Sequence, residues 1–242
     1  MNLIIDVGNT RVKAAVFQNN ALKQVLVFNK SKIISEVKTI VKKYAITDGI
    51  ISSVGNITNS KQVKLNQLLP LIDLNAQTKV PFKNLYSTPT TLGVDRIALA
   101  AAAVNKFPKK NVLVIDAGTC VTFDFINKDK TYLGGAISPG IRMRYKALHV
   151  FTSKLPMLET GIPESFIGNS TKTAIDSGVV NGICNEIDGV IEQYKKKYPD
   201  LTLVLTGGDA NFLAKQLKSV IFATPNFILE GLYAILIHNK EE

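Results

Sequence analysis

The sequence predicts an α/β protein with two similar lobes, each a sheet with flanking helices, and two observations support this prediction. An apolar strand, a turn with Asp and Gly, and a second apolar strand occupy residues 3–17, and the same pattern returns at residues 112–126. A further strand and then helical periods follow each copy. Because no linker rich in Gly, Ser or charge separates the halves, we expect two tightly packed lobes with a cleft between them.

The first half of the chain predicts alternating strands and helices. The expected elements after the first hairpin are a strand at 19–28, a helix at 31–44, a short buried strand at 49–54 and a helix at 60–70. Ser31 is the expected N-cap of the first helix, and Pro70 stops the second. Residues 75–92 contain two prolines and no clear period, so we expect a long irregular segment, and such segments are often binding elements.

The second half begins with an alanine-rich helix, which starts near Val94. The expected elements that follow are strands within 112–126 and 131–140, helices at 140–151 and 170–196, a strand, glycine turn and helix within 201–217, and a last helix within 224–239. We expect Asp209 to cap the helix after the glycine turn.

Composition indicates an ordinary globular protein. The chain has 242 residues, of which 46% are hydrophobic and 20% charged, and it has no apolar run of the roughly 18–20 residues that a membrane span needs. Asp6 and Arg11 interrupt the pattern of a secretory leader, so we expect a cytoplasmic protein. The two cysteines and two histidines are far apart and give neither zinc spacing nor a disulfide framework, and Cys120 is expected to be a small buried residue in a strand.

The net charge of +10 favours anionic ligands without choosing among them. The lysines are scattered, apart from Lys195 to Lys197 and a few pairs, so most of the excess is expected on ordinary surface. No recognisable DNA-reading motif is present, and we do not expect nucleic acid or a membrane as a partner.

The two similar turns contain the residues that we expect to bind the ligand. Asp6 and Asp116 each precede a glycine by two residues, with a threonine nearby. Glycine lets an anion approach successive backbone N–H groups, and an aspartate beside phosphate requires a cation between them. Mg²⁺ bound by one or two carboxylates and substrate phosphates meets that requirement. The alternative is a hairpin that only uses common turn residues, but its repetition and a third glycine turn at 205–210 favour metal-bound phosphate.

Several segments together resemble the type III pantothenate kinases. These are DVGNTRVK at 6–13, GVDR at 93–96, DAGTCVTFD at 116–124, LGGAISPG at 133–140, GNSTKTAIDSG at 168–178 and LTGGDA at 205–210. The resemblance implies the actin, hexokinase and Hsp70 superfold, in which two duplicated ribonuclease-H-like lobes, of mixed sheets and flanking helices, surround an interlobe nucleotide cleft. The lobes would be residues 1–108 and 109–242. It also implies phosphorylation of pantothenate by ATP, the first step of coenzyme A biosynthesis.

The resemblance assigns roles to individual residues. The ATP-binding residues would be Asp6, Val7, Gly8, Asn9, Thr10, Arg11, Val12, Lys13 and Thr119. Asp6 would also hold Mg²⁺ through phosphate or water, and Asp116 would bind a monovalent cation, K⁺ or NH₄⁺. Asp124 and the glycines of 205–210 are more consistent with structural or adenosine-side contacts.

On the substrate side, the resemblance makes Asp95 the proton acceptor, and its alternative role is to cap a helix. The substrate-binding residues would be Tyr86, Gly93, Val94, Asp95, Arg96 and Thr171. Thr173 replaces Thr171 if the register shifts by two, because Asn169-Ser170 departs from the Lys-Asn common in the family. Family members are homodimers. The rival interpretations are another kinase or phosphatase of the superfold and a non-enzymatic accessory transcription factor.

Overall fold

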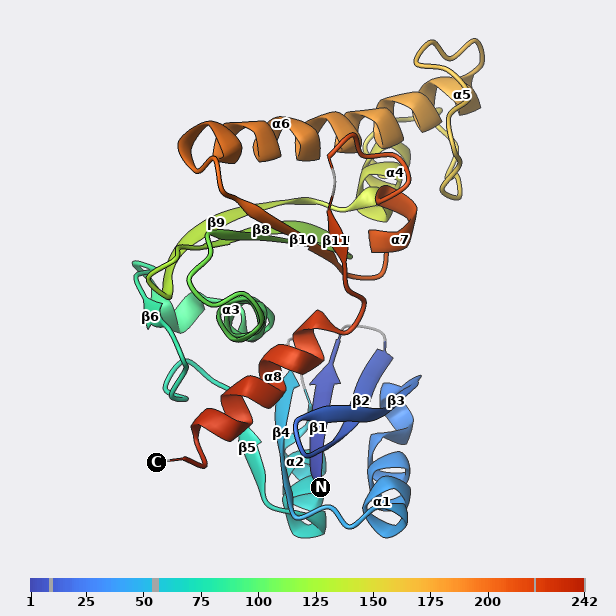
Figure 1. The fold of residues 1–242 in the computed structure, drawn as a ribbon. Coiled ribbons are helices and arrows are strands. Elements are labelled where there is room, and N and C mark those ends of the chain that lie inside the picture. Colours follow the sequence, from blue (N-terminus) through green and yellow to red (C-terminus); the bar gives the residue numbers. More distant parts are fainter. Residues whose placement is uncertain (9–10, 54–56, 220, 242) are drawn as a thin grey trace. The chain divides into compact units, whose positions relative to one another are not determined.

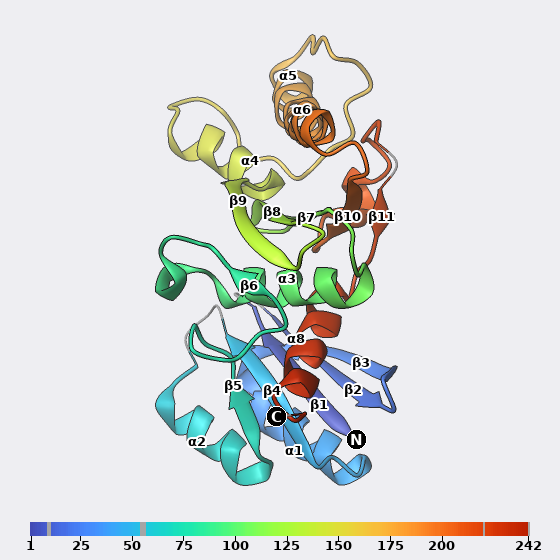
Figure 2. The ribbon, with the colours of Figure 1, turned by 60° about the vertical axis from the view of Figure 1, so that its left-hand side comes forward.

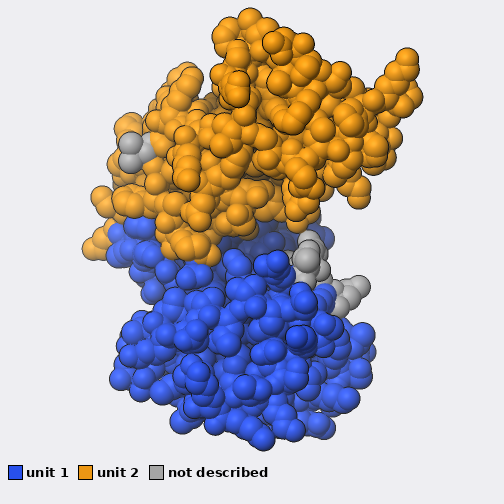
Figure 3. All heavy atoms as spheres, turned by 90° about the vertical axis from the view of Figure 1, so that its right-hand side faces the viewer, with its two compact units in different colours: residues 1–108, 130–132, 226–242 blue, residues 109–129, 133–225 orange. Residues whose placement is uncertain are grey.

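The computed structural model describes residues 1–8, 11–53, 57–219 and 221–241 and divides into two compact units. Unit 1 contains residues 1–108, 130–132 and 226–242, and unit 2 contains residues 109–129 and 133–225 (Figure 3). The last helix thus belongs to unit 1, whereas a single division at residue 108 would assign it to the second lobe.

The sheet of unit 1 has the strand order β3-β2-β1-β4-β5 (Figure 1). Its strands are β1 (Asn2–Val7), β2 (Arg11–Gln18), β3 (Ala21–Asn29), β4 (Asp48–Ser53) and β5 (Leu71–Asp73). The first three strands are antiparallel neighbours joined by short turns, whereas β4 and β5 run parallel to β1. The helices α1 (Ile33–Lys43) and α2 (Asn59–Leu68) make the parallel crossovers, as such connections require.

Side chains alternate across this sheet and give it two different faces. Leu3, Ile5 and Val7 pack into one core with apolar residues of α1 and with Leu65 of α2. The opposite face is next to α3 (Val94–Lys106) and α8 (Phe227–His238), which contact β4 and each other (Figure 2). Asp6 alternates with Ile5 and Val7, so its side chain lies on this second face.

The two helices α3 and α8 cross closely at a glycine. A Cβ atom on Gly231 of α8 would lie 1.8 Å from the carbonyl oxygen of Ala98 in α3. No other residue fits there without a shift of the backbone, and the alanines of α3 keep the contact short. Tight packing of α8 therefore fixes α3, whose first turn carries Asp95.

Unit 2 repeats the same arrangement, with the strand order β11-β10-β7-β8-β9. Its strands are β7 (Val112–Ala117), β8 (Cys120–Ile126), β9 (Thr131–Pro139), β10 (Thr202–Thr206) and β11 (Phe222–Ala223). The short β6 (Lys83–Asn84) pairs in parallel with Thr131 and Tyr132, the part of β9 that belongs to unit 1. The repetition confirms the duplicated α/β fold that the two hairpins predict.

The helices of unit 2 are α4 (Ile141–Val150), α5 (Thr171–Asp176), α6 (Gly182–Lys197) and α7 (Ala210–Leu213). In Figures 1 and 2, α6 lies along one face of the sheet, where Ile183, Ile187 and Ile191 enter the core of the unit. The helix expected at 170–196 is interrupted by a π turn at Ser177–Asn181. None of the described helices is both long and apolar enough to cross a membrane.

Two local expectations are wrong, and a third is confirmed only in part. Ser31 does not cap α1, because it lies within a 3₁₀ turn at Lys30–Lys32 and the helix begins at Ile33 after Lys32. Cys120 is only partly buried, because it opens β8 at the edge of a turn, and Cys184 is the buried cysteine. Asp209 does hold the N-cap position of α7, but its side chain makes no capping hydrogen bond.

Candidate active site

Asp6 lies near the end of β1 between two strands that supply polar partners. In the sheet register it stands opposite Lys13 of the antiparallel β2 and Ser52 of the parallel β4. The three side chains therefore project from the same face of the sheet. Ser52, which is 1% exposed, donates a hydrogen bond of 2.9 Å from its hydroxyl to Asp6 Oδ1.

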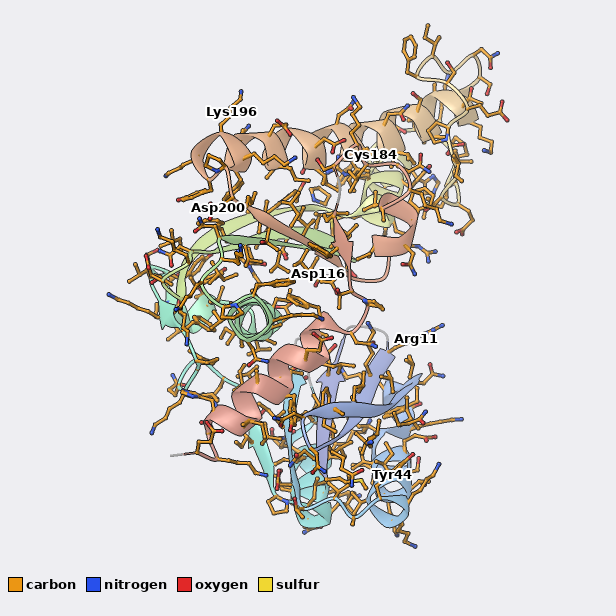
Figure 4. All side chains as sticks on the ribbon, viewed as in Figure 1. Arg11, Tyr44, Asp116, Cys184, Lys196 and Asp200 are labelled. Atoms are coloured by element: carbon orange, nitrogen blue, oxygen red, sulfur yellow. The ribbon has the colours of Figure 1, made fainter. Side chains whose placement is uncertain are left out.

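The turn after Asp6 is closed by its own backbone. The amide of Gly8 donates to the carbonyl oxygen of Arg11 at 3.0 Å, and a Cβ atom on Gly8 would lie 3.2 Å from that oxygen. Arg11 is exposed at the start of β2 (Figure 4). Val7 and Val12 are fully buried in the core, so only their main-chain groups are available to a ligand. Asn9 and Thr10, two of the residues expected to bind ATP, lie outside the described residues.

The surroundings of Asp6 shift the pKa of its carboxyl group in opposite directions. Burial is the largest influence and raises the pKa of the Asp6 carboxyl, and the negative charge of Asp95 raises it further. The hydrogen bond from Ser52 and the positive charge of Lys13 lower the pKa but do not cancel the rise. Two carboxylates from distant segments thus share one electrostatic environment, and a cation beside them would relieve their repulsion.

Asp95 lies in the first turn of α3, which is 13 residues long and begins at Val94. Its Oδ1 accepts a hydrogen bond of 2.8 Å from the amide of Arg96, and Gly93 makes room for this oxygen, since a Cβ atom there would lie 2.4 Å from it. Asp95 therefore does assist the helix start, although Gly93 occupies the N-cap position. Its side chain is half-buried and retains a second oxygen for another partner.

Arg96 and Tyr86 contact each other, as residues of one ligand site would. The guanidinium carbon of Arg96 lies 5.5 Å from the centre of the Tyr86 ring, within the range of a cation–π interaction. The centre of the Tyr86 ring also lies 6.1 Å from the centre of the Tyr132 ring. The backbone amide of Tyr86 donates to Asn84 Oδ1 at 2.9 Å. The irregular segment before α3 is therefore anchored at Tyr86, and it brings this residue to the helix that carries Asp95.

Asp116 occupies in unit 2 the position that Asp6 occupies in unit 1. Asp116 is labelled in Figure 4 and lies near the end of β7. In the sheet register it stands opposite Thr122 of the antiparallel β8 and Thr206 of the parallel β10. Gly207 has a φ of +98° and passes so close that a Cβ atom would lie 2.4 Å from Asp116 Oδ1. Only glycine combines this left-handed backbone with such an approach.

The turn after Asp116 is packed by a further glycine. The amide of Gly118 donates to the carbonyl oxygen of Cys120 at 2.9 Å, as Gly8 donates to Arg11. Gly140 donates its amide to the carbonyl oxygen of Thr119 at 3.1 Å, and a Cβ atom there would lie 2.2 Å from the carbonyl oxygen of Gly118. Thr119 is exposed on this turn and available to a ligand.

Thr171 lies in another part of unit 2, at the start of α5. It lines an open, mostly apolar groove of about 880 Å³ together with α4 and the segment that follows it. Thr173, the alternative, takes part in the N-cap of α5. The Ser170 and Thr173 hydroxyl oxygens lie 2.9 Å apart. Each hydroxyl oxygen also accepts a hydrogen bond from the backbone amide of the other residue. The cap leaves Thr171 as the threonine that faces the groove.

The described residues contain no group of three or more His, Cys, Asp and Glu side chains placed to hold a metal ion. A Mg²⁺ ion at the Asp6–Asp95 site would thus have to complete its shell with water and substrate phosphate, the arrangement that Mg²⁺ usually adopts. The oxygen donors fit that ion. Asp116, with the threonines beside it in the sheet, likewise offers only oxygen donors.

Sequence reasoning assigned no role to Ser52, Thr206 or Gly140, although the last two lie within the quoted motifs. Ser52 and Thr206 stand beside the two aspartates only because β4 and β10 are parallel neighbours of β1 and β7. A hydroxyl residue at the carboxyl end of each of these strands was the available signal, as in IISS at 50–53 and VLT at 204–206.

Comparisons with known proteins agree on one family. Residues 2–193 match the family model described as type III pantothenate kinase. A type III pantothenate kinase from Christiangramia forsetii is 49% identical over all of both chains, and one from Flavobacterium johnsoniae is 48% identical over 96% of both.

Solved structures share the fold at low sequence identity. A Campylobacter jejuni protein assigned to the Baf family of transcriptional activators has a TM-score of 0.64 and 22% identity, over 99% of this chain and 100% of its own. A glucokinase from an Antarctic psychrotroph has a TM-score of 0.54 and 14% identity, over 98% of each chain. At these identities the two structures show the actin and hexokinase-like fold alone.

Proposed function

The chain belongs to the type III pantothenate kinase family, so it is a kinase that phosphorylates pantothenate with ATP in coenzyme A biosynthesis, and we propose which residues perform the transfer. The product is 4′-phosphopantothenate. The observation that carries the assignment is that α3, with Asp95 in its first turn, packs against the same face of the unit 1 sheet from which Asp6 projects. This packing places an aspartate suited to metal-bound phosphate in the same unit as one suited to the acceptor alcohol.

Asp95 is the proton acceptor in this proposal. The primary hydroxyl of pantothenate is a poor nucleophile, and a carboxylate within hydrogen-bond reach takes its proton as the phosphoryl group is transferred. The Asp95 side chain is held by the Arg96 amide through one oxygen, which leaves the other for the hydroxyl. The proton thus moves from the substrate oxygen to a carboxylate whose orientation is already set.

The turn from Asp6 to Lys13 binds the ATP phosphates. The backbone amide of Arg11 and the charge of Lys13 oppose the phosphate charge, and Gly8, whose amide donates to the Arg11 carbonyl oxygen, shapes the turn. Asn9 and Thr10 are included on the family resemblance alone. Asp6, oriented by Ser52, holds Mg²⁺ through water or phosphate. The ion neutralises phosphate charge. Phosphoryl transfer depends mainly on such neutralisation and on positioning of the reactants, rather than on covalent catalysis.

Tyr86, Gly93, Val94, Arg96 and Thr171 bind pantothenate. Arg96 supplies a cation for the carboxylate of the substrate, and the Tyr86 ring holds its guanidinium in place. Gly93 and Val94 open α3 and shape the backbone beside Asp95. Thr171 is included on the family resemblance, and its side chain is exposed at the start of α5.

Asp116 binds a monovalent cation, K⁺ or NH₄⁺, and Thr119 contacts ATP. The half-buried carboxylate and exposed threonine of this turn support these roles. A monovalent cation reduces repulsion among the phosphates, so we expect activity to depend on it.

A homodimer in the cytoplasm completes the proposal. Unit 2 exposes large apolar side chains, with Phe151 84%, Phe166 81% and Ile167 68% exposed, and a second copy of the chain would cover them. ATP as a substrate supports the cytoplasmic location. Light scattering after gel filtration tests the dimer, and a monomer at micromolar concentration would contradict it.

A coupled assay of ADP release tests the function. We expect release that requires pantothenate and Mg²⁺ and increases with K⁺ or NH₄⁺ over Na⁺. Mass spectrometry should identify 4′-phosphopantothenate in the same reaction. Release that ignores pantothenate would contradict the kinase assignment, whereas equal rates in Na⁺ and K⁺ would contradict only the role of Asp116.

A further inference from the structure

A buried carboxylate in unit 2 lies outside every role assigned above. Asp176 ends α5 and is 3% exposed. The hydroxyl of Tyr145, itself 2% exposed, donates to Asp176 Oδ1 at 2.7 Å. The ammonium group of Lys172 donates to Asp176 Oδ2 at 2.6 Å. Each carboxylate oxygen thus has a donor of its own, which is the condition for keeping a charge in the interior.

This cluster fixes the beginning of α5. Lys172 is one helical turn before Asp176, so their ion pair runs along the helix from its first turn to its last. The cap made by Ser170 and Thr173 holds the same first turn from the other side. Thr171 lies between these two constraints, and its position therefore depends on both.

The cluster and the residue after it also contact the irregular segment that precedes α5. The amide of Gly161 donates to the Tyr145 hydroxyl at 3.4 Å, and a Cβ atom on Gly161 would lie 2.8 Å from Asp176 Oδ2. The next residue, Ser177, donates from its hydroxyl to the carbonyl oxygen of Phe166 at 2.7 Å. The π turn begins at Ser177, and such turns often occur at functional sites.

We propose that Asp176 is a positioning residue for pantothenate, which acts by holding Thr171, together with the neighbouring residues 161–168, in place. This inference rests on the proposed role of Thr171. Asp176 touches no reacting atom, so its loss should weaken pantothenate binding more than it slows transfer. The ATP turn of unit 1 contains none of these residues, and binding of ATP should not change.

The test compares Asp176→Asn, Tyr145→Phe and Lys172→Ala with the unchanged enzyme. Asparagine keeps the volume but turns its NH₂ group, a donor, toward either Lys172 or Tyr145. We expect Asp176→Asn to raise KM for pantothenate about tenfold or more, with kcat within about threefold and KM for ATP unchanged. Tyr145→Phe and Lys172→Ala should raise the pantothenate KM less than Asp176→Asn does. Lys172→Arg keeps the positive charge, so its KM values should match those of the unchanged enzyme.

Hydrogen exchange gives a readout that does not depend on activity. In Asp176→Asn, the amides of residues 161–168 should exchange about tenfold faster, while those of the unit 1 sheet keep their rates. Lys195→Ala is the matched control, since Lys195 pairs with Glu192 at 3.4 Å on the exposed surface of α6, and it should change nothing.

Two results would overturn the proposal. One is a pantothenate KM within twofold of the unchanged enzyme in Asp176→Asn, and the other is unchanged exchange at residues 161–168. An enzyme that ignores pantothenate from the start would instead contradict the proposed function, and the exchange measurement would still decide whether Asp176 holds the segment.

Discussion

Ser52 donates a 2.9 Å hydrogen bond to Asp6 from the neighbouring parallel strand, and the two residues stand directly opposite each other in the register of the sheet. The bond joins a serine that is 1% exposed to a carboxylate near the strand end. It orients Asp6 and supports its charged form against burial and the charge of Asp95. Because Ser52 is part of the sheet, the orientation of the Asp6 carboxylate does not depend on the conformation of a loop.

The first prediction follows from this bond. Ser52→Ala removes a donor to a charged group, an interaction of about 1.5–3 kcal/mol, so the KM for Mg-ATP should rise about tenfold or more. Ser52→Thr keeps the hydroxyl and should stay near the unchanged enzyme in the same Mg²⁺ titration. Equal KM values for the alanine and threonine variants would contradict the role of the hydroxyl.

A second prediction separates the two roles of Asp95. Asn at this position still offers an oxygen to the amide of Arg96, but it cannot accept a proton from the substrate. We expect Asp95→Asn to lower kcat by about 100-fold or more and to leave the melting temperature within a few degrees. Unchanged turnover with a lower melting temperature would instead assign Asp95 to the helix start alone.

Asp6→Ala provides the third prediction. The variant loses the carboxylate proposed to hold Mg²⁺ and should show no ATP-dependent activity, whereas its circular dichroism spectrum should match that of the unchanged protein. The fold should survive because the side chain of Asp6 lies outside the apolar core that Leu3, Ile5 and Val7 form. Global unfolding on this substitution would favour the purely structural turn.

The duplicated hairpins were predictable because each carries its signal locally. Apolar strands of period two and a turn with Asp and Gly are visible within 15 residues, and both were found where expected. The partners of those turns were not visible, since the parallel pairing that brings Ser52 to Asp6 depends on a crossover through α1. Short strands such as β5 and β11 are stabilised by their neighbours in the sheet rather than by their own sequence.

The parts of the candidate site were predictable only to different degrees. Asp95 and Arg96 follow from a motif, but the ring of Tyr86 over Arg96 depends on how the irregular segment before α3 folds back. The burial of Asp176 beside Tyr145 and Gly161 was not predictable, since an aspartate inside a helical period gives no sign of burial. The π turn after it shifts the helix register, and period alone cannot show such a shift.

The fourth prediction uses the two cysteines as reporters. Burial raises the pKa of the Cys184 thiol to about 11, with help from the charge of Asp188, so this thiol stays protonated and covered at neutral pH. Cys120 is partly exposed next to Thr119. A thiol reagent at pH 8 should therefore label Cys120 alone, and Mg-ATP should slow the labelling if Thr119 contacts the nucleotide.

Mass spectrometry of the labelled protein identifies the modified residue, and Cys184→Ser should label at the unchanged rate. Labelling of Cys120 that Mg-ATP does not slow would contradict the contact between Thr119 and ATP. Rapid labelling of Cys184 in the native protein would contradict its burial in the core of unit 2.

The last prediction concerns stability at alkaline pH. Burial and the hydrogen bond to Asp176 raise the pKa of Tyr145 to about 12, from an ordinary value near 10. The unfolded chain therefore releases this proton at lower pH than the folded protein does. The stability contributed by Tyr145 is fully present below about pH 10 and is lost as the pH rises toward 12. Urea unfolding at about pH 8 and pH 11 measures it, with Tyr145→Phe as the reference that removes this one titration. The excess stability of the unchanged protein over Tyr145→Phe should shrink at the higher pH, and a constant difference would show that the hydroxyl is not held in its neutral form by Asp176.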